Sequence, residues 1–116
     1  MRALNFYSSV YHVNILAGEK HCTIRLGDKT SKYAVGDIVW VTHGDRFRPR
    51  KKLCTAVLDK VTVKTVSELS PEDLQGENPD MKTIDDAIDF LREIYMREIS
   101  PDELVTVIYF SEVVED

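Results

Sequence analysis

Gly18-Glu19-Lys20-His21-Cys22-Thr23-Ile24-Arg25 places a lysine, a threonine and an arginine together at the start of a predicted strand. Residues 21–26 alternate in polarity, so Cys22 and Ile24 fall on one face of that strand. Thr23 and Arg25 then share the other face. Upstream, the helical spacing of apolar residues predicts a helix from Ser8 or Ser9 to Ala17, and Gly18 ends it. The stretch therefore predicts a helix followed by a strand, and one face of that strand carries the polar side chains of Thr23 and Arg25.

The rest of the chain adds four strands and two helices to this unit. The other strands are expected at 4–7, 38–43, 53–66 and 104–113, where β-branched and aromatic residues concentrate. Ser70-Pro71 starts a short helix, which Gly76 and Pro79 interrupt, and Thr83 caps a longer helix over 84–96. This order predicts an α+β fold, a small and mostly antiparallel β-barrel of about five or six strands with peripheral helices. A ferredoxin-like sheet fits less well, because strands outnumber helices in the middle of the chain.

Composition indicates one globular domain over residues 1–116, because 43% of the residues are hydrophobic. The apolar runs are too short to span a membrane, and the N-terminus lacks the apolar region of a signal peptide. We therefore expect a cytoplasmic protein. Cys22 and Cys54 lie in predicted strands and are interpreted as small hydrophobic residues. The three histidines show no ligand spacing, so no metal site is expected.

Charge is distributed unevenly along the chain. The net charge is −5, yet residues 19–60 hold ten Lys or Arg and five acids, so this segment carries +5 and the remainder −10. Most of the excess lies in a predicted basic loop, Asp45 to Lys52. A basic segment in an acidic protein is a candidate anion-binding face, and a solvated loop is the equally supported alternative.

The residues of the opening stretch can support chemistry. A lysine beside a threonine hydroxyl can act as a base if its surroundings lower its pKa, and an arginine can clamp a phosphate or carbonyl oxygen. Spacing alone favours the simpler interpretation of a solvated strand start, because Lys-x-x-Thr-x-Arg is short and common.

A family resemblance changes that balance. Gly18-x-Lys20-x-x-Thr23-Ile24-Arg25, followed by Val35-Gly36-Asp37-Ile38-Val39, resembles the signature of ASCH domains, small barrels of the PUA-like superfamily associated with RNA and nucleobases. The similarity runs from the first strand to Val107-Ile108-Tyr109-Phe110. Within that family, the chain resembles small bacterial amidohydrolases that deacetylate N4-acetylcytidine. This resemblance implies catalytic roles for Lys20, Thr23 and Glu77. In the resulting hypothesis, Arg25 holds the base or the developing oxyanion, and no metal or organic cofactor is needed. Judged by the residues alone, Glu77 is a solvated acid in a loop.

Other functions remain open at this stage. The main rival is a non-catalytic RNA-binding module, and some ASCH-like proteins cleave RNA. Such a module would use Arg25 and the basic loop on phosphates and an aromatic side chain for stacking. Trp40 is expected in the core, so Phe47 is the preferred stacking residue. The candidate nucleic-acid-binding residues are Arg46, Phe47, Arg48, Arg50, Lys51 and Lys52. A protein-interaction domain that uses the acidic C-terminal half is a third alternative. The expected partner is a nucleoside or RNA, and the oligomeric state is open.

Overall fold

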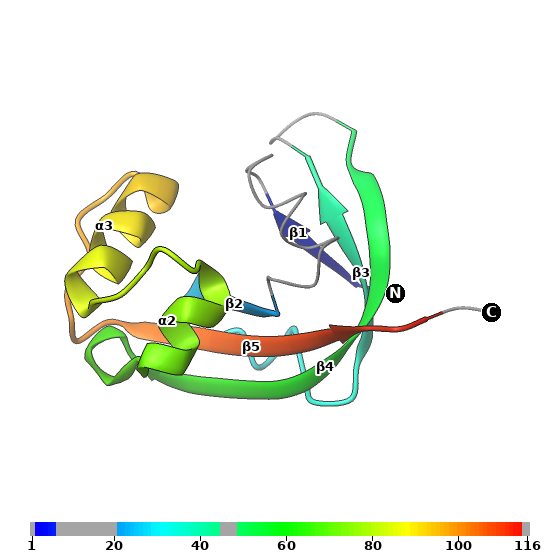
Figure 1. Cartoon of the computed structure of the whole chain (residues 1–116), viewed down its shortest axis with the longest axis horizontal. Coiled ribbons are helices and arrows are strands. Elements are labelled where there is room, and N and C mark those ends of the chain that lie inside the picture. Colours follow the sequence, from blue (N-terminus) through cyan, green and yellow to red (C-terminus); the bar gives the residue numbers. More distant parts are fainter. Residues whose placement is uncertain (1, 7–20, 45–48, 115–116) are drawn as a thin grey trace.

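The computed structural model describes residues 2–6, 21–44 and 49–114. Five strands form one mixed sheet in the order β1-β3-β4-β5-β2 (Figure 1). They are β1 (Ala3–Phe6), β2 (Cys22–Leu26), β3 (Ile38–His43), β4 (Lys51–Thr65) and β5 (Leu104–Glu112). β1 pairs with β3 in parallel, and the other three pairings are antiparallel. The predicted α+β class and mostly antiparallel sheet are confirmed, with five strands that curve into a half-barrel.

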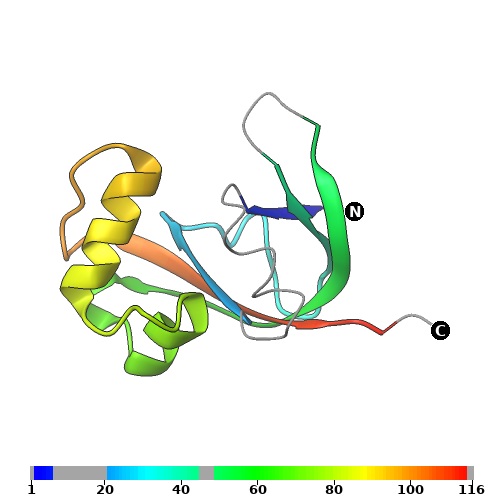
Figure 2. The same ribbon diagram turned by 45° about the horizontal axis from the view of Figure 1, so that its top comes forward.

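The curvature comes from β4, which is long enough to serve two neighbours. Its first part pairs with β3 and its second part with β5, and the register shifts between Val41 and Thr42 and again between Leu58 and Lys60. Such irregularities bend a strand and increase its twist. β4 is therefore strongly curved, as Figure 2 shows, and the sheet wraps around a first core. That core contains Leu4, Phe6, Tyr33, Val39, Val41, Ala56, Leu58, Ile108 and Phe110.

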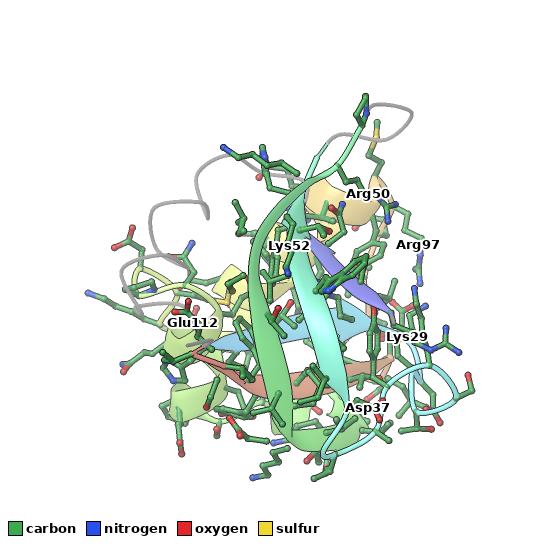
Figure 3. The ribbon with its side chains drawn as sticks, turned by 90° about the vertical axis from the view of Figure 1, so that its right-hand side faces the viewer. Lys29, Asp37, Arg50, Lys52, Arg97 and Glu112 are labelled. Carbon is green, nitrogen blue, oxygen red and sulfur yellow. The ribbon has the colours of Figure 1, made fainter. Side chains whose placement is uncertain are left out.

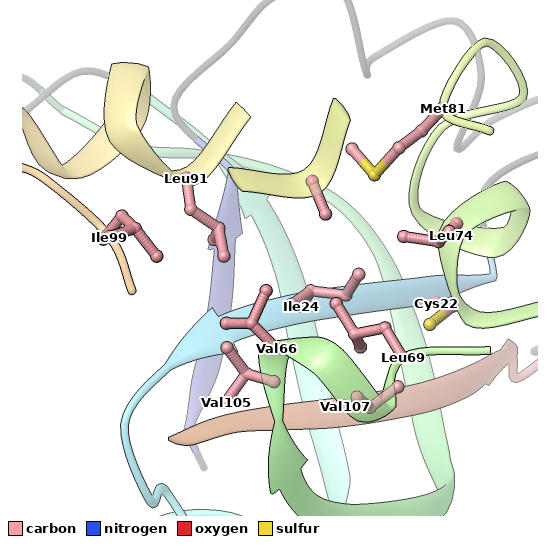
Figure 4. Packing of buried hydrophobic residues seen from close by; sticks show 11 residues of the cluster. Cys22, Ile24, Val66, Leu69, Leu74, Met81, Leu91, Ile99, Val105 and Val107 are labelled. Carbon is pink, nitrogen blue, oxygen red and sulfur yellow. The ribbon is translucent and has the colours of Figure 1, made fainter. Parts of the chain in front are cut away.

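The helices cover the end of the sheet formed by β2 and β5. After a short 3-10 turn (Val66–Glu68), α2 (Pro71–Glu77) and α3 (Ile84–Tyr95) begin at the predicted caps. The Ser70 hydroxyl accepts a hydrogen bond from Asp73 N at 3.0 Å, and the Thr83 hydroxyl accepts one from Asp86 N at 3.1 Å. The helices bury a second core, which includes Cys22, Ile24, Leu74, Leu91, Val105 and Val107 (Figure 4). No described helix is long and apolar enough to cross a membrane.

Two sequence predictions about the basic region are wrong. Lys51 and Lys52 belong to β4 and not to a loop, because they continue the pairing with β3. Trp40 is 44% exposed, although it was expected in the core. Its neighbours Val39 and Val41 point into the core, so strand alternation directs Trp40 outward. The helix predicted over 8–17 lies outside the described residues.

Candidate functional site

The candidate site lies along β2, an edge strand of the described sheet. Along one backbone edge, β2 forms hydrogen bonds with β5. His21 O accepts a hydrogen bond from Phe110 N at 2.9 Å, and Gly27 N donates one to Leu104 O at 2.8 Å. Because backbone direction alternates along a strand, the N–H groups of Ile24 and Leu26 point away from β5. Ile24 N donates to Glu77 Oε2 at 2.7 Å, and Leu26 N donates to the Tyr95 hydroxyl at 3.1 Å. Side chains of α2 and α3 thus take the place of a neighbouring strand.

Glu77 is not the solvated loop acid that its sequence context indicated. It is the last residue of α2, and only 2% of its surface is exposed. Burying a carboxylate is costly unless hydrogen bonds compensate, and the Ile24 N–H supplies one such bond. The preceding glycine permits this placement, because a Cβ on Gly76 would lie 2.7 Å from the Cys22 Cβ. α2 therefore approaches β2 closely, and its end delivers Glu77 to the backbone beside Thr23.

Thr23 and Arg25 share the face of β2 opposite Cys22 and Ile24, as the alternation predicted. Thr23 is buried, with 2% of its surface exposed, and its Oγ1 accepts a hydrogen bond from Arg25 Nε at 2.9 Å. The Arg25 guanidinium carbon lies 4.9 Å from the centroid of the Phe6 ring. Phe6 is on β1, so Arg25 connects the two edge strands of the described sheet.

One nitrogen of this guanidinium stands out chemically. Arg25 Nη2 is buried and makes no hydrogen bond in the described part of the chain. A buried donor without an acceptor costs about 1–3 kcal/mol, and somewhat more when it is charged. Nη2 is therefore a donor in a protected position, suited to a carbonyl oxygen or a developing negative charge on a ligand.

The structure brings together Thr23, Arg25 and Glu77 of the predicted residues. Lys20, Arg46, Phe47 and Arg48 lie outside the described residues. Arg50, Lys51 and Lys52 are exposed and lie at or near the start of β4, on the part of the sheet that pairs with β3 (Figure 3). These three cations therefore lie on a separate surface. They do not contribute to the group formed by Thr23, Arg25 and Glu77, which we call the β2 site.

A polar cluster around Asp73 was not predicted from the sequence. Asp73 accepts hydrogen bonds from Lys64 Nζ at 2.7 Å and from the Tyr109 hydroxyl. Burial alone would raise the pKa of Asp73, but the hydrogen bonds from Lys64, Tyr109 and Ser70 outweigh burial and hold it below its usual value. Burial, reinforced by the Asp73 contact, raises the pKa of Tyr109. The sequence indicated only a helix cap at Ser70-x-x-Asp73, because the partners come from distant strands.

A pocket of about 390 Å³ opens on the surface of α2, lined by His21, Glu72, Gln75, Gly76 and Pro79. It adjoins the site through Gly76, but Thr23, Arg25 and Glu77 do not line it. Among the described residues, no three His, Cys, Asp or Glu side chains are grouped so that they could hold a metal ion.

Comparison with known proteins identifies the fold. No protein-family model matches the sequence, and no curated protein is significantly similar to it. An ASCH domain from Lactobacillus crispatus JV V101 superimposes with a TM-score of 0.71 at 19% identity, over 96% of this chain and 79% of that one. A protein from Enterococcus faecalis V583, assigned to the family DUF984, gives a TM-score of 0.72 at 17% identity, over 97% and 80%. The hypothetical protein PH0355 gives 0.66 at 20% identity, over 97% and 100%. The chain therefore has the fold of an ASCH domain, as the sequence motif indicated.

Proposed function

We propose that this protein is an amidohydrolase that removes an acyl group from a modified nucleobase such as N4-acetylcytidine. The observation that carries the proposal is the convergence on β2 of a buried hydroxyl, a buried carboxylate and a guanidinium with one donor that no described residue accepts from. Activated nucleophiles need a hydroxyl, a base and a group that stabilises the oxyanion, and these residue types can supply them. The resemblance to N4-acetylcytidine amidohydrolases supports the choice of substrate.

In the proposed reaction, Lys20 acts as the general base and Thr23 as the nucleophile. The Thr23 hydroxyl transfers its proton to the Lys20 amine while Oγ1 forms a bond to the carbonyl carbon of the amide. The tetrahedral intermediate then expels the nucleobase amine, which takes up a proton, and the acyl group remains on Thr23 as an ester. Water hydrolyses this ester and releases the carboxylic acid.

The two remaining residues assist at the reacting atoms. Glu77 orients Lys20 or protonates the leaving amine, and its carboxylate is held one residue from Thr23 by the Ile24 N–H. Arg25 Nε donates to Thr23 Oγ1, which fixes the hydroxyl, while Nη2 remains available for the substrate carbonyl or the oxyanion. A guanidinium is suited to this double task because its donors are arranged in a rigid planar fork.

Substitution of Thr23 tests the proposal. Thr23→Ala should abolish release of acetate and cytidine from N4-acetylcytidine, whereas Thr23→Ser should retain measurable turnover because the hydroxyl survives. Thr42→Ala is a matched control, because Thr42 is also a buried strand threonine but belongs to β3, where its hydroxyl donates a hydrogen bond to Asn5 Oδ1 at 2.8 Å. Equal activity of Thr23→Ala and the wild type would exclude Thr23 as the nucleophile. Absence of hydrolysis by the wild-type protein would exclude the proposed activity.

A further inference from the structure

The outward face of β3 exposes the chain's single tryptophan. Along this strand Val39 and Val41 are completely buried, whereas Ile38 and Trp40 are 42% and 44% exposed. An isolated exposed apolar residue is common on protein surfaces and needs no explanation. Here, however, an aliphatic and a large aromatic side chain stand at alternate positions on one strand face, and together they form a half-exposed apolar surface.

Cations flank this surface. Lys52 belongs to the neighbouring strand β4, where it pairs with Thr42 of β3. The Lys52 Nζ lies 5.5 Å from the centroid of the Trp40 ring. Lys51 and Arg50 are exposed in the immediately preceding positions. Figure 3 shows Lys52 beside β3 on the outer side of the sheet and Arg50 toward the end of the β3–β4 hairpin. We call Trp40, Arg50, Lys51 and Lys52 the hairpin surface.

The charge of the hairpin surface differs from that of the whole protein. The chain has a net charge of −5, yet three consecutive cations begin at Arg50. The acids labelled in the same view lie apart from them: Asp37 is near the opposite end of β3, and Glu112 is on the other side of β4 (Figure 3). Asp37 is moreover engaged, since its Oδ2 accepts a hydrogen bond from Ala34 N at 2.9 Å. A polyanion is therefore attracted to this part of an otherwise acidic protein.

We propose that the hairpin surface binds single-stranded nucleic acid, with an unpaired base stacked on Trp40 and the adjoining phosphates on Arg50, Lys51 and Lys52. Exposed aromatic rings beside a row of cations are the combination by which proteins hold single strands, because every base has a π-face and every linkage a charge. Bases in a duplex are already stacked and are not available to the ring. This inference does not depend on the proposed hydrolase activity, because the hairpin surface contains none of the residues at the β2 site.

Tryptophan fluorescence provides a direct test. Trp40 is the only tryptophan of the chain, so any quenching on titration with an unstructured oligouridine of about 12 nucleotides reports its environment. We expect saturable quenching at low salt. An abasic strand with the same number of phosphates should cause no quenching, because it has no base to stack.

Variants are compared by the anisotropy of a labelled oligouridine. Trp40→Ala should weaken binding by about 5- to 150-fold, the range that stacking on an aromatic ring provides, and Trp40→Phe should weaken it less. The triple change Arg50→Gln, Lys51→Gln, Lys52→Gln should reduce the slope of log affinity against log salt by about 2. The matched control removes the same charge elsewhere, at the exposed residues Lys29, Lys32 and Lys60. It should leave the slope nearly unchanged.

Several results would overturn the proposal. They are the absence of quenching at low salt, equal quenching by the abasic strand, full affinity in Trp40→Phe and Trp40→Ala alike, and equal effects of the two triple changes. Thermal unfolding of each variant shows whether it is folded, and Trp40→Phe preserves most of the side-chain volume. Hydrolysis of free N4-acetylcytidine, measured on the same samples, reports the β2 site separately. Loss of binding with unchanged hydrolysis would support a surface distinct from that site.

Discussion

Replacement of Glu77 by glutamine separates a chemical role of this carboxylate from a structural one. Glutamine has nearly the same shape, and its amide oxygen can still accept the hydrogen bond from Ile24 N. The bond changes from one with an ionised acceptor, worth about 1.5–3 kcal/mol, to a neutral one worth about 0.5–1.5 kcal/mol. We therefore expect Glu77→Gln to reduce the free energy of unfolding by about 1 kcal/mol.

The catalytic effect should be larger than the effect on stability. A positioned general acid or base contributes about 10²- to 10⁴-fold to the rate, and a glutamine can neither give nor take the proton. Glu77→Gln should thus lower kcat/KM for N4-acetylcytidine at least 100-fold, equivalent to about 2.7 kcal/mol of transition-state stabilisation. Urea unfolding and steady-state hydrolysis on the same preparations measure both quantities.

Tyr95→Phe is the matched control, because it removes the other side-chain acceptor on the same strand edge, the one used by Leu26 N. It should cost about 0.5–1.5 kcal/mol of stability and leave kcat/KM within a few-fold of the wild type. Glu77→Ala should be less stable than Glu77→Gln, since it leaves the Ile24 N–H without its acceptor, at a cost of about 1–3 kcal/mol. A Glu77→Gln protein with wild-type kcat/KM would refute the catalytic role and leave Glu77 as a structural cap of β2.

Two further predictions concern the packing of α2. Gly76→Ala should destabilise the fold by about 1–3 kcal/mol, because the new Cβ would lie 2.7 Å from the Cys22 Cβ and this clash outweighs the helix preference of alanine. Thermal unfolding measures the effect, and a rise in melting temperature would contradict it. The hydrogen bonds of Asp73 keep its pKa below the usual value of 3.8 for an aspartate. Its ionised form therefore stabilises the fold above about pH 4, and this contribution is lost as the pH falls through the lowered pKa. The free energy of unfolding of Asp73→Asn should therefore decline less steeply below pH 4 than that of the wild type, and parallel curves would argue against the contribution of Asp73.

The sequence predicted the face of β2 because one face of that strand is buried and the other is polar. Cys22 and Ile24 lie in the second core, as expected, and Thr23 and Arg25 share the opposite face. The capped helix starts at Ser70 and Thr83 were equally predictable, since a cap is a local interaction within four residues. Local periodicity and local hydrogen bonds therefore account for most of the fold.

The errors at Glu77 and Trp40 come from contacts that a local pattern does not contain. Glu77 is buried because its helix ends against a strand more than 50 residues earlier in the chain, an approach that depends on Gly76. Trp40 lies in the run Ile38-Val39-Trp40-Val41, where every residue is apolar and alternation is hidden. Only the position of β3, with one face on the core and the other uncovered, shows that Trp40 points outward.

The incomplete closure of the barrel links the fold to the candidate site. In a closed barrel every strand N–H finds a neighbouring strand, and no edge remains. Here β1 and β2 are opposite edges of the described sheet, so the outward N–H groups of Ile24 and Leu26 need acceptors from side chains. One of these acceptors is a carboxylate, and Arg25 extends from the same strand to Phe6 on the opposite edge. Glu77 is thus held beside Thr23 by a backbone N–H that an additional strand would otherwise have satisfied, whereas Arg25 is held by its contacts with Thr23 and Phe6. These contacts explain how a small sheet can bury polar groups of the kind that the proposed reaction needs.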